Sequence, residues 1–81
     1  MMKLNYHPEF TKLFLKLDNS IQAKVLNQLV KIRDNPEIGK PMRYTRTGTR
    51  EVYIAPFRLS YIYNKEENRV IILDLYHKDK Q

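Results

Sequence analysis

The sequence predicts an α+β fold, in which two helices cover one face of a small antiparallel sheet. Between residues 8 and 34 the apolar residues recur at three- and four-residue steps, which is the spacing of a helix with one buried face. From residue 50 onward apolar residues alternate with polar ones, which is the spacing of a strand. Because the two spacings occupy separate parts of the chain, they favour an α+β arrangement. A chain of 81 residues is expected to form a single domain over residues 1–81.

The N-terminal half is predicted to hold a short strand and a helical hairpin. Residues 3–6 (KLNY) alternate polar and apolar side chains, and Pro8 suits the first turn of a helix. The first helix is expected within residues 8–17. Residues 18–20 (DNS) interrupt the pattern and offer caps for a second helix over residues 21–34. Because the link is short, the two helices are expected to be antiparallel.

The C-terminal half is predicted to be a three-stranded antiparallel meander with no helix after it. Pro36, Gly39 and Pro41 end the second helix and keep the connection irregular. Short polar turns then separate three segments with strand spacing, and such turns join antiparallel neighbours. The predicted strands are residues 50–55 (REVYIA), 57–64 (FRLSYIYN) and 69–78 (RVIILDLYHK).

Alternation along these strands predicts which side chains face the helices. The helix-facing set consists of Val52, Ile54, Leu59, Tyr61, Tyr63, Ile71, Leu73 and Leu75. The opposite set consists of Glu51, Tyr53, Arg58, Ser60, Ile62, Ile72, Asp74, Tyr76 and Lys78. An antiparallel sheet commonly packs one face on the core and leaves the other free. We therefore expect the charges inside the strands to lie on the free face.

The positive charge of the chain is unevenly distributed. Lys and Arg number 15 and Asp and Glu number 9, a net charge of +6. Between residues 40 and 58 the charged residues are Lys40, Arg43, Arg46, Arg50 and Arg58, with Glu51 as the single acid. Basic surfaces attract polyanions, and tyrosine rings offer platforms on which bases stack. The free face is thus a candidate nucleic-acid surface. One alternative is a solvated face with cross-strand ion pairs, such as Arg58 with Glu51 or Asp74. The other is that the net positive charge only keeps the chain soluble.

Several kinds of site are not expected. The chain has no cysteine, so it has neither disulfides nor thiolate metal ligands. His7 and His77 are too far apart in the sequence to suggest zinc, and His7 is expected to cap a helix or lie at the surface. Gly48 alone makes no phosphate-binding loop. With no signal peptide and no run of roughly 20 apolar residues, we expect a soluble cytoplasmic protein without cofactor, metal or membrane contact.

Three segments of the chain resemble the RelE/ParE superfamily of toxins from type II toxin–antitoxin systems. They are NPEIGKPMRY (35–44), REVYIAPFRLSYIY (50–63) and LDLYHKDKQ (73–81). Within them, FRLSY (57–61) is similar to the family's YR-[LIV]-x-Y strand, and YHK (76–78) is similar to the basic step that ends its last strand. The resemblance covers nearly the whole chain and implies the same order of elements, without a C-terminal helix.

The resemblance implies a toxin but leaves its target open. RelE-like members are metal-independent endoribonucleases that cut mRNA on the ribosome, whereas ParE-like members share the fold and inhibit DNA gyrase. Arg58 matches the arginine near the scissile phosphate, and His77 and Lys78 match the basic step, which favours the ribonuclease branch. Ribonuclease members often carry a tyrosine beyond this step, but no tyrosine follows Lys78, so Tyr76 or Tyr53 would have to substitute. A catalytically inert RNA-binding relative is the third interpretation.

The implied reaction uses the RNA's own nucleophile. The 2′-hydroxyl attacks the adjacent phosphorus and leaves a 2′,3′-cyclic phosphate and a 5′-hydroxyl. The resemblance implies a catalytic set of Arg58, His77, Lys78 and Glu51 and an RNA-binding set of Arg50, Tyr53, Tyr76, Arg46, Arg43 and Lys40. An imidazole suits acid–base work near neutral pH, Glu51 is the rival base, and a guanidinium suits the phosphate oxygens. A purely structural His77, capping the strand, is the alternative.

The resemblance also implies two partners. One is a cognate antitoxin, expected as an extended acidic and apolar segment that crosses the helices and the sheet. The other is the ribosome with its bound mRNA.

Overall fold

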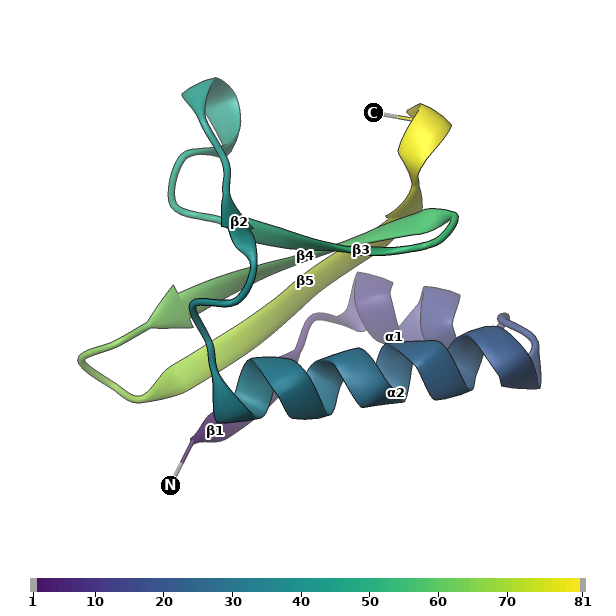
Figure 1. The fold of residues 1–81 in the computed structure, drawn as a ribbon, viewed down its shortest axis with the longest axis horizontal. Helices are drawn as coiled ribbons and strands as arrows, with labels where there is room; N and C mark the ends of the chain where they lie inside the picture. Colours follow the sequence, from purple (N-terminus) through teal and green to yellow (C-terminus); the bar gives the residue numbers. More distant parts are fainter. Residues whose placement is uncertain (1, 81) are drawn as a thin grey trace.

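The computed structural model of the protein describes residues 2–80 and has two layers (Figure 1). Helices α1 (Pro8–Phe14) and α2 (Asn19–Asp34) lie on one side of a five-stranded sheet. Two single turns of 3₁₀ helix, η1 (Tyr44–Arg46) and η2 (Lys78–Lys80), stand on the other side. The strands are β1 (Lys3–Tyr6), β2 (Lys40–Pro41), β3 (Arg50–Ile54), β4 (Phe57–Asn64) and β5 (Arg69–His77). The predicted α+β class and the order of its elements are confirmed.

The sheet is mixed, with the strand order β1-β5-β4-β3-β2. Strands β3, β4 and β5 form the antiparallel meander that alternation predicts. The sequence did not reveal two features at the edges. β1 joins the sheet parallel to β5, and the two-residue β2 extends the opposite edge antiparallel to β3.

Both helices begin at the predicted caps. The side chain of His7 accepts a hydrogen bond from the amide of Glu9 at 3.1 Å, and Asp18 Oδ1 accepts one from the amide of Ile21 at 2.9 Å. The Ile21 amide, followed by the Ser20 hydroxyl, lowers the pKa of Asp18 because both stabilise the carboxylate. The side chains that α2 buries against the sheet are Val25, Leu29 and Ile32. They are part of the predicted helical stripe.

A β-bulge divides β5 into two halves. Ser60 on β4 pairs with Asp74, but the next residue, Tyr61, pairs with Ile72. Leu73 is therefore an extra residue on β5. An extra residue shifts the alternation of a strand by one, so side chains before and after the bulge follow opposite phases.

The bulge corrects the predicted core of β5. Before it, Val70 and Ile72 face the helices and are fully buried, whereas Ile71 and Leu73 are only partly buried. The prediction that Ile71 and Leu73 belong to the core, with Ile72 on the free face, is wrong because an uninterrupted alternation was assumed. After the bulge the prediction is right, since Leu75 is buried at 2% exposure.

A buried tyrosine holds the loop between α2 and β2 against the sheet. The hydroxyl of Tyr61 donates to the carbonyl of Pro36 and accepts from the amide of Gly39, both at 2.8 Å. A Cβ atom on Gly39 would lie 2.5 Å from this hydroxyl, so the position has no room for a side chain. Arg50 Nη1 donates to the carbonyls of Glu37 and Gly39 at 3.0 and 2.8 Å. These bonds fix the start of the segment that carries η1.

Candidate functional site

The outer face, which is the face of the sheet away from the helices, carries two rows of side chains. Residues paired directly across antiparallel strands lie on the same face, so the register defines the rows. The first row runs through Lys40, Glu51, Ser60 and Asp74. The second runs through Tyr53, Arg58 and Tyr76. The polar side chains predicted for the free face therefore lie together there, except Lys78, which follows β5 in the turn η2.

Glu51 is the centre of the outer face. It is only 5% exposed, although both helices lie on the other side of the sheet. Its Oε2 accepts hydrogen bonds from Arg46 Nη1 at 2.9 Å and from the hydroxyl of Tyr76. Its Oε1 lies 3.9 Å from Arg58 Nη1. Two arginines and a tyrosine thus enclose one carboxylate, and the four side chains carry a net charge of +1.

The contact between Glu51 and Arg58 is incomplete. Glu51 Oε1 and Arg58 Nε are both buried, and neither finds a hydrogen-bond partner among residues 2–80. A buried polar atom left without a partner costs roughly 1–3 kcal/mol. Charged groups held at such a cost are typical of functional sites, where the arrangement serves a ligand as well as the fold.

The two arginines of this cluster present permanent positive charge beside aromatic rings. The hydrogen bond to Tyr76, more than the charge of Glu51, raises the pKa of Arg46. Burial, followed by the hydrogen bond to Glu51, raises the pKa of Tyr76, so its phenol stays neutral. The guanidinium carbons of Arg46 and Arg58 lie 5.1 and 5.9 Å from the ring centroids of Tyr76 and Tyr53. Each arginine stays accessible, with side chains 42% and 37% exposed.

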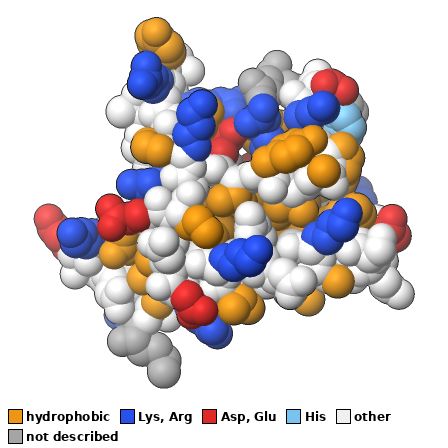
Figure 2. All heavy atoms as spheres, viewed as in Figure 1, with side chains coloured by type: hydrophobic (Ala, Val, Ile, Leu, Met, Phe, Trp, Pro, Cys, Tyr) orange, Lys and Arg blue, Asp and Glu red, His pale blue; other side chains and the backbone are white. Residues whose placement is uncertain are grey.

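The outer face lies between two projections. The segment around η1 and the C-terminal turn η2 both rise from the sheet on the side opposite the helices (Figure 1). Lys and Arg side chains gather around and between these projections (Figure 2). Lys40, Arg43 and Lys78 are exposed there, as their predicted role in binding a polyanion requires.

His77 does not lie beside Arg58. The register places it on the helix-facing side, in a row with Ile54 and Phe57. Its ring packs edge-on against Phe57 at 5.9 Å, and its Nδ1 accepts a weak hydrogen bond from the amide of Asp79 at 3.3 Å. The expectation that His77 and Arg58 act on one phosphate is therefore corrected, because adjacent positions along paired strands point to opposite faces.

Arg50 is also turned away from the outer face. It pairs with Tyr61 on the helix-facing side, and its guanidinium is occupied by the loop carbonyls and by Glu37, whose carboxylate is 3.8 Å away. Its predicted contact with RNA is replaced by a role in positioning the loop. Conversely, Arg46 was expected only to bind RNA, yet it contacts Glu51 directly. It lies in an aperiodic loop, so no strand pattern in the sequence signals this contact.

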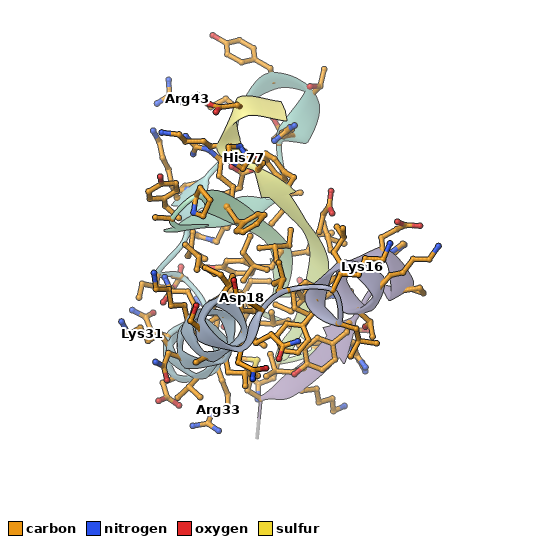
Figure 3. The ribbon with its side chains drawn as sticks, turned by 90° about the vertical axis from the view of Figure 1, so that its right-hand side faces the viewer. Lys16, Asp18, Lys31, Arg33, Arg43 and His77 are labelled. Atoms are coloured by element: carbon orange, nitrogen blue, oxygen red, sulfur yellow. The ribbon has the colours of Figure 1, made fainter. Side chains whose placement is uncertain are left out.

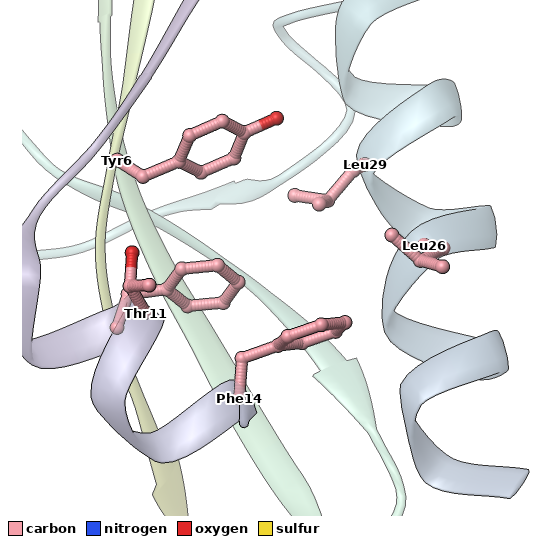
Figure 4. A pocket seen from close by; sticks show the side chains of 6 residues that line it. Tyr6, Thr11, Phe14, Leu26 and Leu29 are labelled. Atoms are coloured by element: carbon pink, nitrogen blue, oxygen red, sulfur yellow. The ribbon is translucent and has the colours of Figure 1, made fainter. Parts of the chain in front are cut away.

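An apolar groove of about 190 Å³ lies between the two helices, near the end of β1 (Figure 4). Its lining residues are Tyr6, Phe10, Thr11, Phe14, Leu26 and Leu29. Tyr6 stacks on Phe10 with ring centroids 5.8 Å apart. Leu26 is 52% exposed at the rim of the groove. The groove is a second surface available to a partner.

In residues 2–80 no group of three or more His, Cys, Asp or Glu side chains is arranged to hold a metal ion. Within the same residues, neither helix has the length and apolar character needed to cross a membrane.

Comparisons with known proteins agree with this architecture. A chain of the toxin–antitoxin complex RelBE2 from Mycobacterium tuberculosis superposes with a TM-score of 0.85 and 25% identity, over 95% of this chain and 98% of that chain. The intact RelBE complex of E. coli gives 0.82 at 16% identity, over 95% and 96%. A YoeB/ParE toxin from Agrobacterium tumefaciens gives 0.83 at 17% identity, over 94% and 98%.

Sequence comparison identifies the family. No curated protein sequence gives a significant match. The family model described as the ParE toxin of the type II toxin–antitoxin system parDE matches residues 4–81. Because this match covers almost the entire chain, the protein belongs to the ParE toxin family, within the RelE/ParE superfamily, and is a toxin of a type II toxin–antitoxin system.

Proposed function

We propose that this toxin is a metal-independent endoribonuclease that cuts mRNA on the ribosome and so blocks translation. One observation carries the proposal: Arg46 and Arg58 flank the hydrogen-bonded pair of Tyr76 and Glu51 on the face of the sheet opposite α1 and α2. Two accessible guanidinium groups suit a phosphate whose charge increases during the reaction. A carboxylate paired with a phenol supplies a proton acceptor beside them.

In this proposal the cluster accepts the proton of the 2′-hydroxyl, and solvent supplies the proton of the leaving group. The RNA 2′-hydroxyl gives its proton to the oxygen of Tyr76, while the phenol passes its own proton to Glu51 Oε2. The freed 2′-oxygen attacks phosphorus, the bond to the 5′-oxygen breaks, and the leaving oxygen takes a proton from solvent near Lys78. Arg46 and Arg58 donate to the non-bridging oxygens. In this scheme Tyr76 reaches the substrate, which the enclosed Glu51 cannot do alone.

The scheme reassigns one role. His77, packed against Phe57 on the helix-facing side, is a positioning residue for the end of β5 rather than the acid or base. Tyr76 takes the place of the tyrosine that the resemblance leads one to expect beyond the basic step.

The test is cleavage of mRNA on translating ribosomes, followed by mapping of new 5′ ends and detection of the 2′,3′-cyclic phosphate on the upstream fragments. We expect Arg58→Ala to reduce cleavage by about 10²- to 10³-fold, the usual loss when a donor to a developing oxyanion is removed. Arg33→Ala is the matched control, since Arg33 is an exposed arginine of α2 (Figure 3). Wild-type protein that yields no new 5′ ends, or equal losses in both variants, would refute the proposal.

A second candidate function is inhibition of DNA gyrase without nuclease activity. It is favoured by the family model, which is that of a ParE toxin, and by the enclosure of Glu51, which a non-catalytic ion-pair network also accounts for. A supercoiling assay separates the two. Inhibition of gyrase by wild type and by Arg58→Ala alike, with no mRNA cleavage, would favour this candidate. RNA binding without either activity would indicate an inert relative.

We also propose that the cognate antitoxin covers both the apolar groove and the outer face. Solved relatives include toxin–antitoxin complexes. In this chain, Leu26 and Val30 of α2 are 52% and 46% exposed, and the net charge is +6. An acidic segment with apolar anchors matches both features, because it would bury the groove and neutralise the arginines.

A further inference from the structure

The segment between β2 and β3 carries an exposed aromatic ring. Tyr44, the first residue of η1, is 90% exposed, the highest value among the large apolar and aromatic residues that remain exposed. Its backbone is left-handed, with φ of 59°. This conformation is disfavoured for a bulky residue, and when it persists at an exposed position it often marks a functional residue.

The backbone of this segment is fixed rather than loose. Thr47 donates to the carbonyl of Tyr44 through both its amide, at 3.1 Å, and its hydroxyl, at 2.7 Å. The Thr49 amide and hydroxyl donate to the carbonyl of Arg46 at 3.1 and 2.8 Å, and the Met42 amide donates to Thr49 at 3.0 Å. Arg46 in turn holds Glu51. Tyr44 therefore lies two residues before Arg46, which belongs to the proposed active site, in a segment whose backbone is held by these hydrogen bonds.

The surroundings of Tyr44 are cationic and hollowed. From residue 40 to residue 50 the chain has four basic residues and no acid. A hollow of about 450 Å³ opens beside the ring, within the roughly 300–1,000 Å³ typical of small-ligand sites. Its lining residues are Lys40, Pro41, Met42, Arg43 and Tyr44. An aromatic plane with two cations and two apolar side chains matches a nucleotide, whose base stacks while its phosphate meets the charges.

We propose that Tyr44 is a base-stacking platform for single-stranded RNA, with Arg43 and Lys40 at the phosphates beside the stacked nucleotide. The inference depends on the proposed function, because it assumes that the substrate of the outer face is RNA. It adds a subsite that would hold a nucleotide flanking the cleaved bond. Charge complementarity favours RNA over an apolar protein partner, since the ring is surrounded by lysine and arginine.

The chain has no tryptophan, so Tyr44→Trp introduces a single fluorescent reporter at this position. Stacking of a base on the indole should quench its emission when a short single-stranded RNA is added. Leu15→Trp is the matched control, because Leu15 is 71% exposed at the end of α1. We expect quenching at position 44 and none at position 15. Binding of the same RNA, followed by anisotropy of a dye on the RNA, serves as the independent measure.

Two further variants separate the ring from the backbone. Tyr44→Asn removes the ring but suits a left-handed residue, and Tyr44→Phe keeps the ring. We expect Tyr44→Asn to weaken RNA binding and raise KM for ribosome-bound mRNA about 5- to 160-fold, corresponding to the roughly 1–3 kcal/mol of one stacked base. kcat should be unchanged, and Tyr44→Phe should behave as wild type.

The outcomes distinguish this inference from the proposed function. Quenching at position 44 with no mRNA cleavage by the wild type supports the stacking site and refutes the nuclease. Cleavage by the wild type with no quenching at position 44, and unchanged KM in Tyr44→Asn, refutes the stacking site and leaves the nuclease standing. Equal quenching at positions 44 and 15 also refutes it, since the contact would not be specific.

Discussion

The two faces of the meander bury their central residues by opposite means. Val52, on the helix-facing side, is 7% exposed because helices and strands pack apolar side chains around it. Its neighbour Glu51 is 5% exposed on the outer face, where Arg46, Arg58 and Tyr76 enclose it. The first kind of burial stabilises the fold through area removed from water. The second kind of burial removes the Glu51 carboxylate from water, which costs desolvation free energy. Low exposure alone therefore does not show that a residue belongs to the hydrophobic core of so small a protein.

The strongest test of this comparison uses two adjacent residues on β4. Leu59 is fully buried on the helix-facing side, whereas Arg58 lies on the outer face. We expect Leu59→Ala to lower the free energy of unfolding by about 2–5 kcal/mol, because it leaves a cavity. Arg58→Ala should change it by less than about 1 kcal/mol while cleavage collapses. Urea denaturation measures the first effect; similar destabilisation by both variants would show that the faces are not separate in function.

A smaller loss of stability is expected from Tyr61→Phe, which breaks the loop anchor. The amide of Gly39 and the carbonyl of Pro36 both lose their partner, so we expect a loss of about 1–3 kcal/mol at neutral pH. Burial raises the pKa of Tyr61, so the folded state keeps this proton while the unfolded state releases it near pH 10. Stability from this group is complete below pH 10 and is lost as the pH rises further.

The measurement for Tyr61→Phe is urea denaturation at pH values from 7 to above 10. The difference between wild type and Tyr61→Phe should narrow as the pH rises, because only the wild type has this ionisation. A constant difference across that range would mean that the hydroxyl does not carry the alkaline loss. Tyr63→Phe is the control, since Tyr63 is only partly buried on the same strand.

Glu51→Gln sharpens the interpretation of the outer face. The amide keeps the shape of the side chain but accepts no proton, so we expect cleavage to fall about 10²- to 10⁴-fold. RNA should bind more tightly, because one negative charge beside Arg46 and Arg58 is removed. The loss of stability should be about 1–3 kcal/mol, because the buried side chain gives up charge-assisted hydrogen bonds to Arg46 and Tyr76. If Glu51→Gln still cleaves mRNA, the carboxylate is not the base and only positions the two arginines.

The smallest effect on stability is expected in the apolar groove. Leu26→Glu changes an exposed residue, so the free energy of unfolding should stay within about 0.5 kcal/mol of wild type. Affinity for the antitoxin should fall at least tenfold, because a charge enters an apolar contact. Asn27→Glu adds the same charge to the adjacent exposed position on α2. Titration calorimetry with the antitoxin compares them, and equal affinities would place the antitoxin elsewhere.

The sequence predicted the fold because its signals are local and repeated. Helical spacing, the cap at Asp18 and the alternation along β3 and β4 each specify one element, and all agree with the structure. The bulge in β5 has no such signal, since RVIILDLYH contains neither Gly nor Pro at the extra residue. No local pattern signals the parallel pairing of β1 with β5 either, because this pairing depends on contacts between the two ends of the chain.

The site was only partly predictable for a related reason. Strand alternation placed Glu51, Arg58 and Tyr76 on one face, and the structure agrees. The same alternation would have put His77 with Leu75 on the other face, but the family resemblance grouped it with Arg58. Arg46 reaches the cluster from a loop without period, and only a three-dimensional structure reveals such a contact.

The extra residue in β5 could be lost without disturbing either face of the sheet. Deletion of Leu73 would join Ile72 directly to Asp74, so that their pairings with Tyr61 and Ser60 would follow one another in an uninterrupted ladder. Ile72 would still point toward the helices, and Tyr76 would still point toward Glu51. A toxin gene shortened by this single codon should therefore still encode both the interior and the charged cluster.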